Sequence, residues 1–478
     1  MVKKLLGVGA LASVPEVIDF ASRLGRTVIL ARLLAPTELG ICIAIGVLLT
    51  IANLLSDFGL DKFVISYQRG DDDEVLASAH QLQIGRGVVL ASLIFIAAPW
   101  LAVLLGAPGQ GASFRWCALI VLLHAFAHLE IMQMQRDFDY APAAKAKLLA
   151  RLTAFAAVYP SARTFGDHRA IILSLLIDAA VYAVSSHCFA RSSYRIMPRD
   201  RRILRKGIAY GLPLTLSGMG IAINSQFDRV LVSYWLGLEA LALYAVILNL
   251  ALIPISVIAA ILGQLGVSFL TRTMSRSDED SYGALVWFYG IIAAVYAVMI
   301  AATLDVLAPL TFGRQYHVAP LIQGLVVLIA WLRISRGAPT AMMLVRAHTR
   351  QLMTANLLAG VGLALSALLL PIAPHLETVL FCLLFGDLLS LVFFSRAAVK
   401  DVEQPGSVLR HLGCSLASAV LASAGVFLLA PLSLWSRAAV MGVPMLLIAA
   451  QILLGFRRFL RAPGIGLCLP DRSIHDPF

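Results

Sequence analysis

Long apolar runs alternate with short polar loops from one end of the chain to the other. About fourteen of these runs reach the length of about 20 residues that a helix needs to cross the hydrocarbon core of a membrane. The first run carries several charges and the fifth contains charges and a proline, so any number of spans from twelve to fourteen fits the pattern. The pattern predicts an all-α polytopic membrane protein.

The first apolar run has a charged face. Glu16, Asp19, Arg23 and Arg26 fall within a narrow arc when successive residues turn by 100°. Each ionised side chain at the centre of a bilayer costs about 2.5–3.5 kcal/mol on insertion scales, so such residues normally face a bundle interior or a wet cavity. The face predicts the wall of a polar pathway. Asp19 and Arg23 are also four residues apart, so neutralising each other within the helix is the alternative.

Composition and charge distribution support a membrane protein. Hydrophobic residues make up 60% of the 478 residues and charged residues only 14%, although the net charge is +11. Lys and Arg concentrate in alternate loops, which by the positive-inside rule places both termini in the cytoplasm. The basic charge therefore indicates topology and contact with anionic membrane lipids rather than with nucleic acid. The six cysteines form no CxxC pair, which argues against a disulfide framework or a metal site.

The two halves of the chain repeat weakly at an offset of about 200 residues. Leu34-Ala35 aligns with Leu236-Gly237, and Arg26-Thr27 aligns with Asp228-Arg229. Both copies start on the cytoplasmic side, which predicts a parallel repeat of two pseudo-symmetric six-helix lobes. We therefore expect three parts: an N-terminal lobe at 1–200, a C-terminal lobe at 201–400, and two additional spans with a cytoplasmic tail at 401–478.

Two stretches resemble a known family. The stretch ARLLAPTELGICIAIGVLLTIANLLSDFGLDKFVISYQRGD (31–71) is similar to the opening signature of polysaccharide flippases of the PST (Wzx-like) type. The stretch YGLPLTLSGMGIAINSQFDRVLVSYWLGLEALALYAV (210–246) is similar to the second-half signature of the same family. The resemblance implies the two-lobe fold of the multidrug/oligosaccharidyl-lipid/polysaccharide exporter superfamily.

The resemblance also implies a function. Such flippases move polyprenyl-pyrophosphate-linked oligosaccharide repeat units of O antigen, capsule or exopolysaccharide from the cytoplasmic to the periplasmic leaflet by alternating access. The implied carrier lipid is undecaprenyl pyrophosphate, and the implied location is the bacterial inner membrane. A polysaccharide polymerase and export machinery are the implied partners.

Arginines in the spans are the candidates for binding the pyrophosphate. Planar guanidinium groups satisfy phosphate oxygens well in a cavity of low dielectric constant. Arg229 lies near the outer end of its span. The alternative to a role in binding is that its side chain reaches out to the membrane–water interface. The predicted substrate-binding residues are Arg23, Arg26, Arg229, Arg333 and Arg336.

Acidic residues in the spans are the candidates for ion coupling, namely Glu16, Asp19, Asp57 and Asp228. Glu16 has no basic residue four positions on, which makes it a candidate for proton exchange. Asp57 approaches a cytoplasmic helix end, where ordinary solvation is the alternative. Asp178, Asp305 and Asp387 stand alone in their spans and are expected to be structural.

No cofactor or catalytic site is expected. His124 and His128 have the spacing of a zinc-binding helix, but Glu130 is not aligned with them and no His-Glu-x-x-His motif is present. A phosphate-binding Gly-x4-Gly-Lys-Ser/Thr loop is absent, which argues against direct use of ATP. We therefore expect a transporter and not an enzyme.

Three alternatives remain open at the level of sequence. A lipid II flippase and an ion-coupled drug exporter belong to the same superfamily, although the arginine-rich face argues against a cationic drug. A membrane glycan polymerase belongs to a different class. Such an enzyme generally needs a sizeable outer loop or an acidic catalytic motif, and neither is visible.

Overall fold

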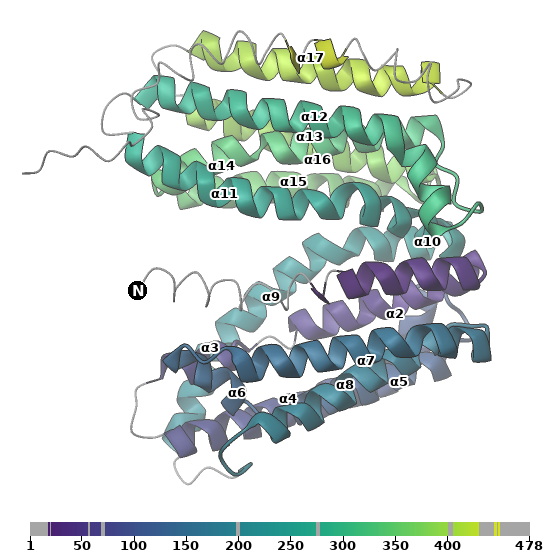
Figure 1. Cartoon of the computed structure of the whole chain (residues 1–478), viewed down its shortest axis with the longest axis vertical. Helices are drawn as coiled ribbons and strands as arrows, with labels where there is room; N and C mark the ends of the chain where they lie inside the picture. Colours follow the sequence, from purple (N-terminus) through teal and green to yellow (C-terminus); the bar gives the residue numbers. More distant parts are fainter. Residues whose placement is uncertain are drawn as a thin grey trace, which may run out of the picture. The chain divides into compact units, whose positions relative to one another are not determined.

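The chain folds into α-helices joined by short connections (Figure 1). The computed structural model describes residues 18–19, 21–55, 58–67, 72–196, 201–273, 278–399, 405–429, 444–446 and 448–449. Over these residues the regular structure is helical and contains no strand. The predicted all-α fold is confirmed.

Many of the helices suit a membrane. In the described part of the chain, eight helices are long and apolar enough to cross one, or nine if a pair bent by 57° forms one span. One face of α4 (Asp72–Leu104) carries large apolar side chains that are 58–70% exposed, at Val89, Leu93, Ile96 and Trp100. Their spacing follows the helical repeat, as expected of a face in contact with lipid tails. The total of fourteen spans stays a prediction.

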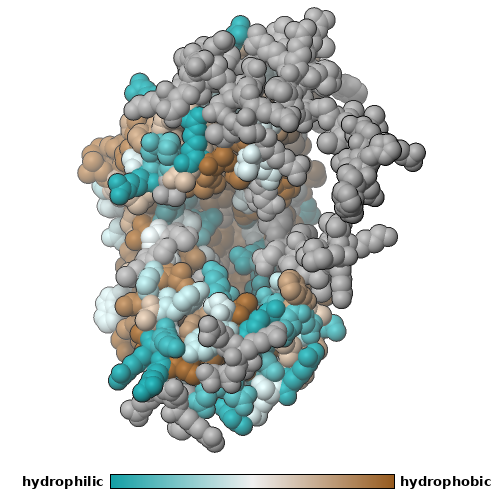
Figure 2. All heavy atoms as spheres, turned by 90° about the vertical axis from the view of Figure 1, so that its left-hand side faces the viewer, coloured by the Kyte–Doolittle hydropathy of each residue, from teal (hydrophilic) through white to brown (hydrophobic). Residues whose placement is uncertain are grey.

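The helix ends differ from such apolar faces. Figure 2 looks onto the left-hand side of Figure 1, where hydrophilic residues gather in patches with apolar residues between them. Hydrophilic residues of this kind suit the interface between a membrane and water.

Packing divides the chain into two compact units. Unit 1 comprises Met1–Val246 and Leu310–Tyr316, and unit 2 comprises Ile247–Pro309 and His317–Phe478. The helix that we expect to open the second lobe, α9 (Arg201–Leu236), belongs to unit 1 because it packs against α2 and α4. The division into lobes at residue 200 therefore stays a prediction.

The first described helical residues of unit 1 are 18–19 and 21–33. The elements that follow are α2 (Pro36–Leu55), α3 (Leu60–Ser66), α4, α5 (Gly111–Ala125), α6 (Glu130–Gln133), η1 (Met134–Asp137), α7 (Ala141–Phe165), α8 (Arg169–Phe189), α9 and most of α10 (Leu238–Ile247). The helices α5 and α6 are the pair bent by 57°. In this unit α8 packs against both α5 and α7.

Unit 2 starts at a π-helical turn. Its elements are η2 (Leu248–Leu252), α11 (Ile253–Thr273), most of α12 (Asp278–Phe312), α13 (Pro320–Ser335), α14 (Gly337–Val345), α15 (Thr349–Leu369), α16 (Leu376–Val399) and α17 (Pro405–Leu429). In this unit α16 packs against both α13 and α15. The order of a broken helix followed by a packed helical pair is the same in both units.

Glycines allow α9 to lie close to α2. A Cβ on Gly218 would collide with the carbonyl oxygen of Leu54. The chain turns at Leu236-Gly237, because α9 ends at Leu236 and Gly237 has a φ of 86°. That left-handed conformation favours glycine and separates α9 from α10.

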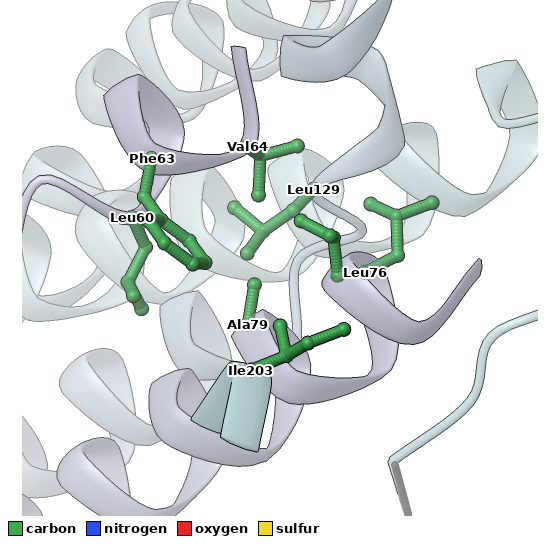
Figure 3. Packing of buried hydrophobic residues seen from close by; sticks show 8 residues of the cluster. Leu60, Phe63, Val64, Leu76, Ala79, Leu129 and Ile203 are labelled. Atoms are coloured by element: carbon green, nitrogen blue, oxygen red, sulfur yellow. The ribbon is translucent and has the colours of Figure 1, made fainter. Parts of the chain in front are cut away.

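One end of unit 1 has a compact apolar core (Figure 3). Phe63 of α3, Leu76 of α4 and Ile203 of α9 are each no more than 5% exposed and share one cluster with Leu129. Arg136 caps the same α3 helix, because its Nε donates to the carbonyl oxygen of Ile65 over 3.1 Å. This core fixes α3 and α6 to the long helices α4 and α9.

Candidate functional site

A charged cluster joins the first helical segment of unit 1 to α7 and α8. Asp19 pairs with Arg23 over 2.7 Å and with the Nε of Arg151, on α7, over 2.5 Å. Arg151 in turn donates from Nη1 to Oδ2 of Asp178, on α8. Together with Arg26 these residues are called the unit 1 cluster.

Small residues bring the backbones of α7 and α8 together at this cluster. Ala150 and Ala154 of α7 are almost fully buried, and the hydroxyl of Ser174 donates to the carbonyl oxygen of Ala154 over 2.9 Å. Small side chains at such contacts let helices approach closely within a membrane. The close approach places Arg151 within reach of Asp178. From α5, the Nε2 atom of His124 lies 4.0 Å from Oδ2 of Asp178.

Arg26 is the most enclosed arginine of this cluster. It is 6% exposed, and within the described residues its Nη1 atom has no hydrogen-bond partner. A buried charge is costly unless paired and hydrogen-bonded. With three arginines against two aspartates, the cluster has one excess positive formal charge when His124 is neutral. An additional anion would be stabilised here.

A second charged cluster lies in unit 2. Both carboxylate oxygens of Asp387 are bound by arginine: Oδ2 lies 3.0 Å from Nε of Arg333, and Oδ1 lies 2.9 Å from Nη1 of Arg336. Arg336 also donates from Nη2 to Oδ1 of Asn356 over 3.1 Å and lies over the ring of Phe394 at 5.6 Å. These residues are called the unit 2 cluster, and its ionised groups also sum to one excess positive charge.

The backbone explains the geometry of the unit 2 cluster. Arg336 lies at the junction between α13 and α14, so it extends from the point where the helix is interrupted. Gly362 of α15 and Gly386 of α16 face each other so closely that a Cβ on Gly386 would lie 2.7 Å from the backbone nitrogen of Gly362. This contact brings Asn356 and Asp387 to the same arginine.

Several of the predicted site residues lie together in the two clusters. Asp19, Arg23 and Arg26 share one cluster, and the neutralising pair between Asp19 and Arg23 is also present. Arg333 and Arg336 share the other cluster. Their roles in binding stay predictions.

The other predicted residues do not join these clusters. Arg229 donates to Oε1 of Gln226 on its own helix, and Oδ2 of Asp228 accepts the hydroxyl proton of Tyr244 over 2.7 Å. Glu16 and Asp57 lie outside the residues that the structure describes.

The sequence analysis missed the residues at the centre of each cluster. It treats Asp178 and Asp387 as isolated, whereas each one binds arginine side chains in the structure. Arg151 and Asn356 are not among the predicted site residues. The available signal was a charged residue interrupting an apolar run, but nothing in the sequence identifies its partner.

The predicted histidine pair has two separate environments. His124 approaches Asp178, whereas His128 packs in a ring cluster with His80, His187 and Tyr194. In the part of the chain that the structure describes, no group of three or more His, Cys, Asp or Glu side chains is arranged to hold a metal ion. Tyr194 follows α8 in a loop, and burial raises its pKa to about 12, so it is protonated at neutral pH.

Hydrogen bonds also connect helix ends within unit 1. Glu38 of α2 accepts both the backbone N–H of His168 over 2.9 Å and its Nδ1 over 2.7 Å. His168 Nε2 lies 2.7 Å from the hydroxyl of Ser113, at the start of α5. In the same loop a hydrogen bond from Arg169 is the main cause that lowers the pKa of Asp167. These contacts connect the helices that carry the unit 1 cluster.

Comparison with known proteins identifies the family of the chain. The family model described as polysaccharide biosynthesis protein matches residues 29–321. The lipopolysaccharide biosynthesis protein WzxC of Escherichia coli (strain K12) is 22% identical over 66% of this chain and 65% of its own length. The succinoglycan biosynthesis transport protein ExoT of Rhizobium meliloti (strain 1021) is 25% identical over 63% of this chain and 61% of its own length. The match thus spans less than two thirds of each relative.

Solved structures share the fold. A lipid II flippase, MurJ, in an inward closed conformation superimposes with a TM-score of 0.67 at 11% identity, covering 94% of this chain and 99% of the other. An inward-facing multidrug resistance transporter of the MATE family and MOP superfamily gives 0.60 at 16% identity, covering 84% and 99%. These similarities confirm the two-lobe fold that the resemblance of the two stretches implies.

Proposed function

Because the chain belongs to the family described as polysaccharide biosynthesis protein, we propose that it is a flippase for polyprenyl-pyrophosphate-linked oligosaccharides. It moves these repeat units from the cytoplasmic to the periplasmic leaflet of the bacterial inner membrane by alternating access. Both of its termini are cytoplasmic, and it delivers its substrate to a polysaccharide polymerase and export machinery.

The observation that carries this proposal is the excess positive charge of both clusters. Each is built from arginines on helices of a membrane protein, and each has one cation more than its aspartates neutralise. Buried guanidinium groups are expensive to keep in a bilayer unless anions bind them. A pyrophosphate head group supplies such an anion, whereas a cationic drug would be repelled.

The arginines replace the water that a pyrophosphate loses on leaving the interface. Guanidinium groups donate two parallel hydrogen bonds to phosphate oxygens and keep their charge at any physiological pH. Arg26 supplies the N–H group without a partner, and Arg333 and Arg336 form a pair whose spacing already suits an anion with two oxygens. The arginine side chains of each unit are therefore already oriented to bind an anion.

Gene deletion tests the proposal. Without the transporter, undecaprenyl-pyrophosphate-linked oligosaccharide is expected to accumulate on the inner leaflet, and surface polysaccharide is expected to be lost. Mass spectrometry of the extracted lipid identifies the glycan, and the wild-type gene on a plasmid restores export. Accumulation of lipid II instead, or sensitivity to drugs without any lipid-linked intermediate, would contradict this function.

Asp228 is the acid that we propose for ion coupling. Asp19 has two arginine partners, whereas Asp228 accepts a hydrogen bond from Tyr244, and its Oδ1 atom is buried without a partner among the described residues. No ion pair of Asp228 is found in that part of the chain. A carboxylate in a membrane helix without a neutralising cation is suited to bind and release a proton.

Asp228→Asn is expected to remove the response of transport to a proton gradient. In proteoliposomes, stimulation by an imposed pH gradient should fall about tenfold, while transport driven by the substrate gradient remains, because the amide cannot ionise. Tyr244→Phe is the control, because it removes the hydrogen bond but keeps the carboxyl group. Wild-type stimulation in Asp228→Asn would exclude Asp228 from coupling.

A further inference from the structure

The two charged clusters occupy equivalent positions in the two units. In each unit a helix is interrupted, at the junction of α5 with α6 or of α13 with α14, and a packed helical pair follows, α7 with α8 or α15 with α16. His124 precedes the interruption in unit 1, and Arg333 precedes the interruption in unit 2. These two residues are 209 positions apart in the chain (124 to 333). The aspartates that face them, Asp178 and Asp387, are also 209 residues apart (178 to 387).

Both aspartates are deeply buried at the centre of their clusters. The side chain of Asp178 is 4% exposed and that of Asp387 is 7% exposed. Arg151 donates to Asp178, and two different arginines bind the two oxygens of Asp387. A buried carboxylate in a membrane is retained at high cost, and here the cost is offset by arginine.

The carboxylate of Asp387 has the same relation to its arginines as a phosphoryl group would have. The two carboxylate oxygens accept hydrogen bonds from two guanidinium groups at 3.0 and 2.9 Å. Two oxygens of a phosphoryl group can accept hydrogen bonds from the same donors. Arg336 has further support from Asn356 and Phe394, so it stays in place when its bond to Asp387 is given up. The arginines are thus kept oriented for an anion in the absence of substrate.

We propose that Asp178 and Asp387 are resident counter-ions that the substrate's phosphate displaces from the arginines on binding, and that re-form their ion pairs when the substrate leaves. They are positioning residues that act through Arg151, Arg333 and Arg336. This inference rests on the proposed function for the identity of the anion, although the exchange itself concerns only the arginines and an anionic ligand.

The exchange has a consequence that a purely structural ion pair lacks. Asp387→Asn keeps the size of the side chain and removes the charge that competes with the ligand. The affinity for an anion should therefore rise, whereas substrate release should slow because no carboxylate returns to the arginines. The expected signature is a lower KM together with a lower kcat for transport.

Titration of the purified full-length protein with inorganic pyrophosphate tests the exchange. In isothermal calorimetry, Asp387→Asn is expected to bind pyrophosphate about tenfold more tightly than the wild type. Arg333→Gln is expected to bind it at least tenfold more weakly, and Asp387→Glu to stay close to the wild type. Unchanged or weaker binding of pyrophosphate by Asp387→Asn at an unchanged Tm would overturn the proposal. The absence of pyrophosphate binding by both the wild type and Asp387→Asn would also overturn it.

Asp178→Asn provides the second measurement if Asp387→Asn does not fold. The same rise in pyrophosphate affinity is expected there, because Asp178 occupies the equivalent position in unit 1, and an unchanged affinity would overturn the proposal for that unit. The result of the pyrophosphate titration can be distinguished from a test of the proposed function. A gene deletion that accumulates no lipid-linked oligosaccharide would refute the flippase function, whereas the pyrophosphate titration would still decide the exchange.

Discussion

Arg26→Gln is expected to reduce polysaccharide export at least tenfold while the protein accumulates to its normal level in the membrane. Arg26 is almost fully buried, and its Nη1 is without a partner in the described part of the chain, so the substitution removes an N–H donor that is available to a ligand. A hydrogen bond from a charged donor is worth about 1.5–3 kcal/mol, equivalent to a tenfold or larger change in affinity. Surface polysaccharide and inner-leaflet intermediates, measured together, report the loss.

The matched control is Arg163→Gln. Arg163 is an exposed arginine in the last turn of α7, where it lies over the ring of Tyr159 at 5.8 Å. This variant should export normally, because an exposed cation contributes little to a buried site. Arg26→Lys should retain part of the activity, since the charge remains but the planar fork is lost. Normal export by Arg26→Gln would remove this residue from the pathway.

The sequence is sufficient to predict features that depend on local spacing. Helical periodicity places Asp19, Arg23 and Arg26 on one face, and the structure brings them into one cluster. The turn at Leu236-Gly237 is likewise predictable, because a left-handed residue at a helix end favours glycine. Such features involve residues within about two helical turns of one another.

The partners of these residues are not predictable in this way. Arg151 binds Asp19, which is 132 positions earlier in the chain, and Asp178, which is 27 positions later. In the sequence each is one charge in an apolar run, and many such charges are equally plausible partners. Their meeting depends on how closely α7 and α8 pack, which small residues along both helices decide jointly.

The assignment of α9 to unit 1 is not predictable from the sequence for the same reason. The sequence repeat aligns this helix with the first span and so predicts that it opens a second lobe. In the structure it is counted with unit 1, because glycines such as Gly218 let it contact α2 closely. A repeat records the order of elements along the chain, whereas compactness depends on contacts between side chains and backbones that the repeat does not specify.

Gly362→Ala is expected to destabilise the protein, although alanine is the better helix former. A Cβ at this position would lie 3.2 Å from the Cα of Gly386 and closer still to the carbonyl oxygen of Cys382. Relieving the collision must move α15 away from α16, at a typical cost of about 1–3 kcal/mol. The same movement withdraws Asn356 from Arg336, so transport should fall together with Tm.

Gly263→Ala in α11 separates this collision from the general effect of replacing a glycine. A Cβ there meets no atom within 4 Å, so the helix should gain about 0.5–1 kcal/mol from reduced backbone entropy in the unfolded chain. The two variants make the same chemical change in helices of one unit, and the expected shifts in Tm have opposite signs. Equal shifts, measured by thermal denaturation of the purified proteins, would show that the close approach of α15 and α16 does not constrain the unit 2 cluster.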